Sequence, residues 1–320
     1  MSSPLLTKPL PYIALFIAFV IWGGNFVVAK ITLQEFPPMT LAFFRFALAS
    51  LFLAPFFLAQ TKKSLPAGRQ VKLDKKDLPR LIAVGILIVT LNIAFFLEGM
   101  RRTTAINASV LSLTTPILSV WFGWWFLKEK IFFVNILGVI LGLLGALIII
   151  GLPQLLTGNY SPQETLGNVL IVLASISWVV GGIIAKPILN KYPTMIVTAI
   201  VFMVGTLTFF IPASSEYIQN PAWVNHLTIL GILGLAYMTL LSSISAYFLY
   251  EWGLSKTSFY KSNLFQYIEP FIAGTLAVSI LGEKISSTFL VGSLLIAASA
   301  ILGTLAKLKT RHHHHKAHRV

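Results

Sequence analysis

The sequence predicts an all-α membrane protein with ten transmembrane helices, arranged as two inverted repeats of five. The composition, the number of long apolar runs and a set of motifs that occurs twice lead to this prediction. Of the 320 residues, 56% are hydrophobic and 11% are charged, and the mean hydropathy is +0.83. A soluble domain of this length requires a larger share of polar residues to cover its surface. The composition therefore indicates a polytopic membrane protein.

The charge and the cysteine content narrow the function classes. The net charge of +14 would also suit a nucleic-acid-binding protein. However, the Lys and Arg residues fall between apolar runs, where they flank membrane spans, so no nucleic-acid partner is expected. The chain has no cysteine, which excludes disulfides and thiolate metal sites. The first apolar run is long and lacks a small-residue cleavage site, so no cleavable signal peptide is expected.

Ten runs are long and apolar enough to be candidate membrane helices. A hydrocarbon core about 30 Å thick requires about 20 apolar residues in a helix. The runs lie at 11–33, 38–59, 79–100, 103–127, 131–152, 167–189, 193–213, 226–252, 258–281 and 286–307. Most connections between them are very short, so each helix is expected to run antiparallel to its predecessor.

The repeat is visible in motifs that recur in the same order. The pairs 156 positions apart are Trp22 and Trp178, Lys30 and Lys186, Pro37 and Pro193, and Met39 and Met195. The pairs 154 positions apart are Gly99 and Gly253, Thr103 and Thr257, Pro116 and Pro270, Glu129 and Glu283, and Gly138 and Gly292. Each copy covers five runs, and because five is odd, the second copy enters the membrane from the opposite side. Inverted repeats of this kind recur in secondary transporters. Chance similarity between apolar segments does not account for collinear matches at Trp, Lys, Pro and Glu.

The distribution of basic residues predicts the orientation. With a cytoplasmic N-terminus, 19 of the 24 Lys and Arg residues lie on the inner side and four on the outer side, while Arg45 lies inside a span. Basic residues concentrate on the cytoplasmic side of membrane proteins. We therefore expect a multi-pass protein of the cell (inner) membrane with both termini cytoplasmic. The connections 153–166 and 214–225 contain no Lys or Arg and are expected to face outward.

The repeat divides the chain into four parts. They are a first five-helix repeat at 11–152, an outer linker at 153–166, a second five-helix repeat at 167–307 and a basic, His-rich tail at 308–320. The histidines of the tail would suit metal binding, a basic cytoplasmic tail or a remnant of expression. We assign no function to the tail.

The motifs resemble those of the drug/metabolite transporter superfamily, specifically its EamA-like branch. The resemblance covers about 11–307 and rests on "WGGN" in the first run, on Pro38 followed by Arg45, and on the proline and the "KE" or "GE" ending of the fourth and ninth runs. It implies two inverted five-helix repeats around a central cavity, and substrates such as amino acids, other metabolites, cations or drugs. The chain departs from symmetry at Val201, which stands where the repeat would place a match to Arg45.

Glu269 is the sharpest candidate for function. It lies about midway along the ninth run, where an ionised carboxylate is costly unless it faces a cavity or a partner. Pro270 follows and is expected to kink the helix. A carboxyl group in this position suits an amine, a cation or a proton as coupling ion. The alternative is a protonated or paired glutamate with a structural role. Gln266, one turn earlier, is expected to share its face.

Arg45 lies seven residues into the second run, about 10 Å from its start at 1.5 Å per residue. It could bind a substrate carboxylate, or it could pair with a carbonyl or glutamate inside the protein. We favour the structural role.

The remaining polar and aromatic residues in the runs have two interpretations. The substrate or coupling candidates are Glu269, Gln266, Asn263, Trp22, Asn25, Trp178, Asn107, Tyr247 and Ser243, and the residues with a structural or substrate role are Arg45, Pro116 and Pro270. The tryptophans could wall a cavity that stacks flat substrates, or they could only pack between helices. Serine and asparagine side chains also hold membrane helices together without binding a substrate.

Two further features carry expectations about packing. Glu98 and Glu251 lie near the ends of runs, and we expect solvated pairs with Arg101 and Lys256. Gly138, Gly142 and Gly145 form a small-residue face that suits close helix contact, within the fold or in a weak homodimer.

The sequence favours a secondary transporter, an exporter or facilitator of small metabolites in the lipid bilayer. It contains no Walker motif, HExxH, GxSxG or paired intramembrane aspartates, so neither an ATPase nor an intramembrane enzyme is expected, and no metal or cofactor is expected. A non-transporting receptor or scaffold remains the alternative, and it is disfavoured by the inverted repeat. The substrate and the direction of transport do not follow from the sequence.

Overall fold

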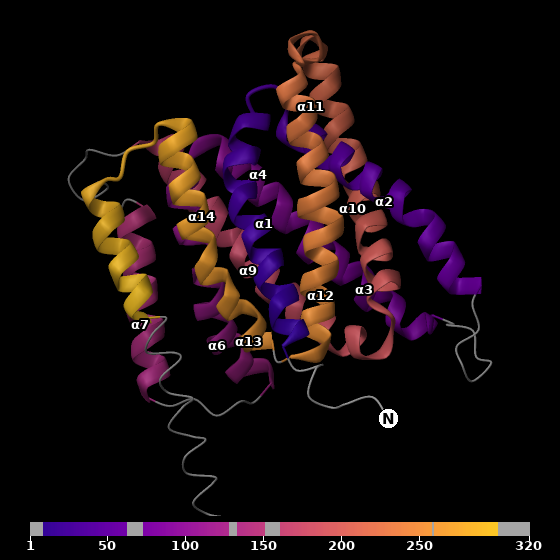
Figure 1. The fold of residues 1–320 in the computed structure, drawn as a ribbon, viewed down its shortest axis with the longest axis horizontal. Coiled ribbons are helices and arrows are strands. Elements are labelled where there is room, and N and C mark those ends of the chain that lie inside the picture. The colour runs from indigo at the N-terminus through magenta and orange to yellow at the C-terminus, as the bar shows by residue number, and fades with distance from the viewer. Residues whose placement is uncertain (1–8, 63–72, 128–132, 151–160, 258, 300–320) are drawn as a thin grey trace, which may run out of the picture.

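The computed structural model describes residues 9–62, 73–127, 133–150, 161–257 and 259–299, and all regular secondary structure within these ranges is helical. The α-helices are α1 (Leu10–Thr32), α2 (Pro38–Lys62), α3 (Leu78–Val84), α4 (Asn92–Arg102), α5 (Ala105–Leu111), α6 (Thr114–Leu127), α7 (Phe133–Ile150), α9 (Pro162–Lys191), α10 (Thr194–Gln219), α11 (Ile229–Ala236), α12 (Ala246–Lys256), α13 (Phe259–Asn263) and α14 (Glu269–Leu276). A further helical segment covers Ser287–Ser299. The helices form an upright bundle (Figure 1).

Short π-helical and 3₁₀ segments join several of these helices. The π-helical segments are η2 (Gly85–Leu91), η4 (Tyr237–Ser245) and η6 (Ala277–Leu281), and the 3₁₀ segments are η1 (Lys75–Asp77), η3 (Pro221–His226) and η5 (Leu264–Ile268). Because the π-helical segments continue their neighbours, α3–η2–α4 and α11–η4–α12 each form one long rod. The two long π-helical segments lie at equivalent positions of the sequence repeat.

Seven helices within the described residues are long and apolar enough to cross a membrane. They cover Leu10–Thr32, Pro38–Ala59, Lys75–Arg102, Pro162–Lys191, Thr194–Gln219, Ile229–Lys256 and Leu264–Leu281. Shorter apolar helices cover Ala105–Ser119, Ile136–Ile149 and Ser287–Ser299. The protein is therefore a multi-pass membrane protein.

The distribution of side chains matches a lipid environment. Large apolar side chains such as Leu51, Ile211 and Phe271 are exposed on the outside of the bundle, at 72%, 76% and 77%. Polar and charged side chains such as Arg45 and Glu269 lie inside, at 1% and 3%. Hydrocarbon chains would cover the exposed apolar faces, whereas the buried polar groups require partners within the protein or a cavity.

The two proline-bearing segments are interrupted. α5 ends at Leu111 and α6 begins at Thr114, which places Pro116 in the first turn of α6. α13 is followed by a 3₁₀ turn, and α14 begins at Glu269, with Pro270 in its first turn. Proline fits a first turn because the N–H that it lacks has no helical partner there. Both breaks free backbone groups and open space near the middle of the bundle.

Repeat-equivalent lysines make equivalent contacts. Lys30 donates to the carbonyl oxygens of Met100 and Thr103, at 2.8 and 2.5 Å. Lys186 donates to the carbonyl oxygens of Leu254 and Thr257. Each ammonium group thus satisfies free carbonyl groups where a rod ends.

The glycine face of α7 is used within the fold. A Cβ atom on Gly145 would lie 2.6 Å from the carbonyl oxygen of Gly292, and one on Gly142 would lie 2.8 Å from Ser299 Oγ. α7 and Ser287–Ser299 therefore approach closely because both carry glycine at the crossing. Gly142 and Gly145 of the glycine face are therefore used for close contact within the fold.

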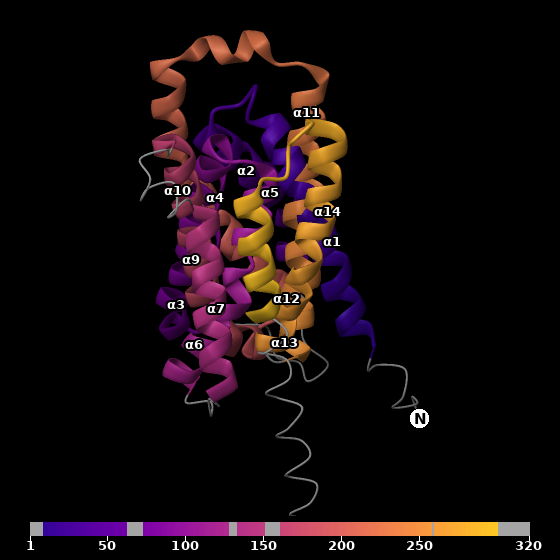
Figure 2. The ribbon, with the colours of Figure 1, turned by 90° about the vertical axis from the view of Figure 1, so that its left-hand side faces the viewer.

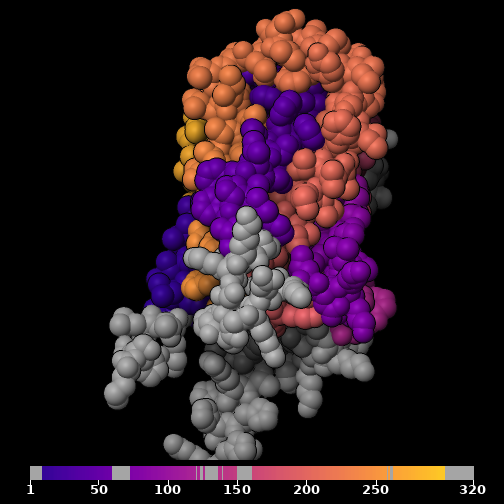
Figure 3. Space-filling model, turned by 90° about the vertical axis from the view of Figure 1, so that its right-hand side faces the viewer, coloured from indigo at the N-terminus to yellow at the C-terminus, as the bar shows by residue number. Residues whose placement is uncertain are grey.

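A bridge joins α10 to α11 across one end of the bundle (Figure 2). α10 extends to Gln219, beyond the predicted end at residue 213, and η3 then lies across the end of the bundle. In the space-filling view this bridge arches over the top, and α2 lies below it (Figure 3). Glu216 accepts from the backbone N–H groups of Met39 and Thr40, at 3.1 and 2.7 Å, and so caps the start of α2.

The other predicted boundaries agree with the structure to different degrees. α9 begins at Pro162, inside the predicted linker 153–166, because Ser161 caps the helix by accepting from the backbone N–H of Glu164. Much of the linker and the whole tail at 308–320 lie outside the described residues.

Candidate functional site

A cavity of about 100 Å³, lined by both polar and apolar side chains, lies inside the bundle. A single water molecule requires about 10–15 Å³ of cavity volume. The cavity can therefore hold several waters or a small solute. The predicted candidates that line it are Trp22, Asn25, Arg45, Trp178, Tyr247, Gln266 and Glu269. Other lining residues are Phe19, Phe26, Asn92, Ile93, Phe96, Ser112, Thr115, Ile171, Ala174, Ser175 and Ser242.

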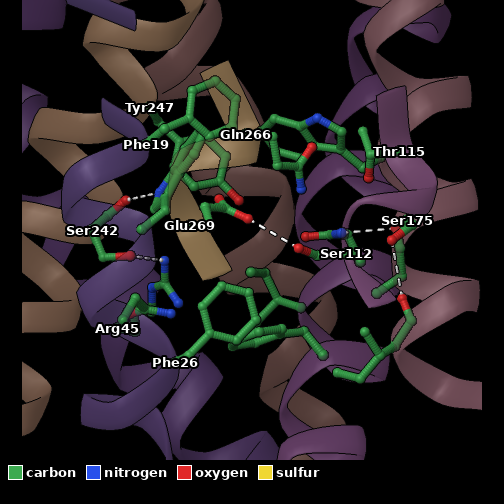
Figure 4. Close-up of a pocket in the computed structure, with 18 residues that line it drawn as sticks. Phe19, Phe26, Arg45, Ser112, Thr115, Ser175, Ser242, Tyr247, Gln266 and Glu269 are labelled. Carbon is green, nitrogen blue, oxygen red and sulfur yellow. Dashed lines mark hydrogen bonds between the residues drawn. The ribbon is translucent and has the colours of Figure 1, made fainter. Parts of the chain in front are cut away.

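Glu269 enters the cavity from the helix break before α14 (Figure 4). Its Oε2 accepts a hydrogen bond from Ser112 Oγ at 3.0 Å. The amide of Gln266 lies beside the carboxyl group, one turn earlier. The two broken segments therefore meet at this carboxyl group, since Ser112 lies in the break between α5 and α6.

Arg45 lies on α2 and is fixed by η4. Its Nε donates to Ser243 Oγ at 2.5 Å, and its Nη2 donates to Ser242 Oγ at 3.1 Å. The guanidinium carbon also lies 5.2 Å from the centre of the Phe46 ring. Among the described residues, no acidic side chain is within ion-pair distance of Arg45. The buried guanidinium is thus held by neutral groups alone and keeps its positive charge at the cavity.

Three buried polar atoms of the lining make no hydrogen bond within the described structure. They are Asn25 Oδ1, Arg45 Nη1 and Gln266 Oε1. A buried polar group without a partner costs about 1–3 kcal/mol, so native proteins keep few of them. Their concentration around one cavity indicates that a polar ligand or water completes them. Arg45 Nη1 can only donate, whereas the two amide oxygens can only accept.

Aromatic rings close one end of the cavity. Trp22 lies edge-on to Trp178 and Tyr247, with ring centres 5.3 and 5.4 Å away. Phe19 and Tyr250 extend this group, and Trp22 Nε1 donates to the carbonyl oxygen of Ser242 at 2.9 Å. We call these five residues the aromatic cluster. The two tryptophans therefore pack edge-on to each other and also line the cavity.

The other predicted candidates lie outside the lining. Asn107 donates to Glu164 at 3.0 Å, near the start of α9. Asn263 accepts from Tyr250 Oη at 2.8 Å and donates to Ser119 Oγ at 3.0 Å. Ser243 supports Arg45 from behind, and Pro116 and Pro270 shape the helix breaks. The structure therefore brings together seven of the predicted residues and places these five around them.

The repeat relates several lining residues that we did not single out. At a spacing of 154, Ser112 matches Gln266 and Thr115 matches Glu269. At a spacing of 156, Phe19 matches Ser175. The repeat, applied to the predicted glutamine and glutamate, therefore points to the serine and the threonine of the first half. The apolar lining residues, such as Ile93 and Phe96, carry no comparable signal.

The expected partners of both glutamates are wrong. Glu251 does not form a solvated pair with Lys256: it is 3% exposed, and its carboxyl group accepts from Thr198 Oγ1. Glu251 lies on the inner face of α12, whereas the Lys256 side chain is exposed. Glu98 does form an ion pair, but with Arg102 one turn later, and not with Arg101.

Comparison with known proteins identifies the family. The sequence profile of the EamA-like transporter family matches residues 9–151 and again residues 165–305. The chain belongs to the EamA-like transporter family. This membership agrees with the resemblance inferred from the motifs and makes the protein a membrane transporter.

Proteins with similar sequences are also named as transporters. An uncharacterised transporter of Archaeoglobus fulgidus is 28% identical over 92% of this chain and 96% of its own length. The uncharacterised inner membrane transporter YedA of Escherichia coli is 26% identical over 92% of this chain and 90% of its own. A solved crystal structure aligns with a TM-score of 0.62 at 16% sequence identity, covering 92% of this chain and 98% of its own, and so shares the fold.

Proposed function

We propose that this EamA-like protein is a secondary transporter that exports, or facilitates the movement of, small metabolites such as amino acids or amines across the inner membrane. The observation that carries this proposal is the set of unpaired polar atoms around the cavity. Arg45 Nη1 offers a charged donor, which suits a carboxylate. Glu269, Gln266 and Asn25 offer acceptors, which suit an ammonium group.

The proposed architecture has ten transmembrane helices in two inverted repeats of five, 11–152 and 167–307. The three shorter apolar helices, added to the seven long ones, would then give the ten membrane helices. The matching contacts of Lys30 and Lys186, the matching breaks at Pro116 and Pro270, and the matched lining residues support this arrangement. In such transporters the site lies between the repeats at broken helices, and the two halves rock around it.

The proposed orientation places both termini in the cytoplasm. The end of the bundle at which α1 begins would face the cytoplasm, and the bridge at η3 would face outward. The excess of Lys and Arg at the cytoplasmic end supports this orientation. We propose a proton as the coupling ion, because Glu269 is a buried carboxyl group inside the cavity that has no basic partner among the described residues.

The test is a two-step measurement with purified protein. A panel of amino acids and amines is first screened by ligand-dependent thermal shift, and each compound that stabilises the protein is then tested for flux in proteoliposomes. Flux of a stabilising amino acid or amine supports the proposal. Stabilisation without flux would instead support a receptor, and flux of neither amino acids nor amines would reject the substrate class.

A further inference from the structure

We propose that Glu251 is a second proton-binding site, behind the aromatic cluster, and that release of its proton opens this end of the cavity. Glu251 does not itself line the cavity. The inference rests on the proposed function, because an opening at this end is meaningful for a protein that moves a solute. The ligand of Glu251 is a proton delivered from the side on which α1 begins.

The position of Glu251 links it to the cavity through one helix face. Ser243, Tyr247 and Glu251 follow at intervals of four along η4 and α12, so all three point into the bundle. Ser243 holds the Arg45 guanidinium, and Tyr247 belongs to the cavity wall. Glu251 therefore lies about two turns beyond Ser243, the residue that holds Arg45, and α12 runs toward the end of the bundle at which α1 begins (Figure 1).

The carboxyl group of Glu251 is incompletely paired. Its Oε2 accepts from Thr198 Oγ1, whereas its Oε1 has no hydrogen-bond partner within the described structure. The side chain is 3% exposed. A buried ionised carboxylate with a single hydroxyl partner is strongly unfavourable. The arrangement therefore fits a carboxyl group that holds a proton in this conformation.

The charged groups on the surrounding helices do not neutralise Glu251. On α9, Lys186 donates to backbone carbonyl groups at the end of α12, and on α2, Arg45 is held by Ser242 and Ser243. On its own helix, Tyr247 and Tyr250 contribute buried phenols, and the Lys256 side chain is exposed.

The other elements packed against α12 contribute neutral groups at this level. α10 contributes Thr198, α1 contributes the aromatic ring of Phe19, and α13 contributes Asn263. Tyr192, just before α10, donates to Asp77. Within the described side chains, then, no cation pairs with Glu251 in this conformation.

Loss of the proton would act on the aromatic cluster through the adjacent residue. Tyr250 packs 5.1 Å from Trp178 and 5.8 Å from Phe19, between ring centres, and donates to Asn263. An ionised Glu251 requires water or a cation, and at 3% exposure the side chain has almost no contact with solvent while these rings remain packed. Ionisation therefore favours a conformation in which the cluster separates and water enters, as expected when a ligand shifts a two-state equilibrium.

Thiol labelling tests this inference, because the chain has no cysteine of its own. The reporter is Ala174→Cys, at a buried position in the cavity wall, in a Glu269→Gln background that removes the cavity carboxyl group. An impermeant thiol reagent is added on the side where α1 begins. Rates are normalised to Arg80→Cys, whose side chain is exposed, to remove the pH dependence of the thiol itself.

We expect the normalised rate to rise with pH by about tenfold per unit until it levels, because opening follows the ionised fraction. Glu251→Gln should keep the rate low at every pH, and Glu251→Asp should restore the rise. An unchanged rise in Glu251→Gln, or no rise in the parent, would overturn the proposal. Thiol labelling requires no substrate, so its result can be interpreted even if the flux experiment fails.

A second measurement covers the case in which Glu251→Gln does not fold. Infrared spectra of the Glu269→Gln protein at neutral pH should show the C=O stretch of a protonated carboxylic acid. The band should be absent or shifted in Glu251→Asp, because its carboxyl group is displaced by one methylene. Absence of the band in protein that retains Glu251 would reject a bound proton at this site.

Discussion

Arg45 shows how a single buried charge depends on its neighbours. The guanidinium is 1% exposed, and the serines at 242 and 243 are its hydrogen-bond partners. Val201 occupies the equivalent position in the other half and is fully buried in the core. One half therefore supplies a cation to the cavity, while the other half supplies only packing. The contacts of two guanidinium nitrogens with serine fit the structural role that the sequence favours, and the third nitrogen is left unpaired at the cavity.

Ser243→Ala tests the structural part of this role. Removing the hydroxyl leaves Arg45 Nε without an acceptor, which costs about 1–3 kcal/mol for a buried group. We therefore expect a lower Tm in detergent for Ser243→Ala. Ser245→Ala is the matched control, because its hydroxyl bonds to a carbonyl oxygen at an exposed site. Equal effects of the two substitutions would show that Arg45 does not depend on Ser243.

Some positions of buried charged residues follow from the sequence, and others do not. Glu269 was predictable because a carboxyl group in the middle of an apolar run requires a cavity or a partner. The burial of Glu251 was not predictable, because its distance from Lys256 along the chain does not show which face of the helix points into the bundle. The unpaired state of Arg45 Nη1 was not predictable either, since it depends on which side chains from another helix arrive beside it.

Helix breaks and helix crossings set the geometry at the scale of elements. The prolines and glycines of the sequence predicted a kink and a close contact. The residues at which α6 and α14 begin, and the π-helical segments, were not predictable, because local hydrogen bonding and packing fix them. Apolar periodicity cannot distinguish a continuous rod from one with a π-helical segment, since both bury the same side chains.

Gly145→Ala tests the crossing of α7 with Ser287–Ser299. The added methyl group would lie 2.6 Å from the carbonyl oxygen of Gly292, so the backbones must separate. Such overpacking costs about 1–3 kcal/mol, and we expect a lower Tm. Gly274→Ala in α14 is the control, because nothing lies within 4 Å of its added atom. Alanine should there be neutral, or stabilising by up to about 1 kcal/mol.

The bridge at η3 should respond to acid through Glu35. The side chain and the backbone N–H of Thr228 donate to this carboxylate, at 2.6 and 2.7 Å, and hold the pKa of Glu35 below its ordinary value of 4.5. Since folding lowers the pKa of Glu35, this contact stabilises the folded state fully above pH 4.5. The stabilisation is lost as the pH falls through the lowered pKa.

Hydrogen exchange provides the measurement for this contact. The amide protection factor of Thr228 should fall on acidification below about pH 4, near the ordinary pKa of a glutamate. Thr228→Val removes the side-chain donor, so its protection should already be reduced at neutral pH and should change less with acid. A protection factor that does not change down to pH 3 would contradict the role of Glu35.

At the scale of the whole molecule, the predicted spans and the distribution of Lys and Arg between them predict a definite topology. Single cysteines at Asn159 and Gln219 should react with an impermeant thiol reagent from outside, and one at Lys72 should not. The absence of native cysteine makes each signal unambiguous. The reverse pattern of labelling would invert the proposed orientation and would place the bridge at η3 in the cytoplasm.

The central claim is that the cavity around Glu269 transports a small solute and couples it to protons. The decisive measurement is flux of a stabilising amino acid or amine into proteoliposomes across a pH gradient, with wild type compared with Glu269→Gln. The gradient is imposed by varying the pH only on the side opposite the start of α1, so that the proposed ionisation of Glu251 stays constant. Because glutamine keeps the shape and accepts from Ser112 but cannot exchange a proton, we expect a monodisperse variant whose flux no longer follows the gradient. Flux through Glu269→Gln that follows the pH gradient as in the wild type would contradict the claim and remove Glu269 from the mechanism.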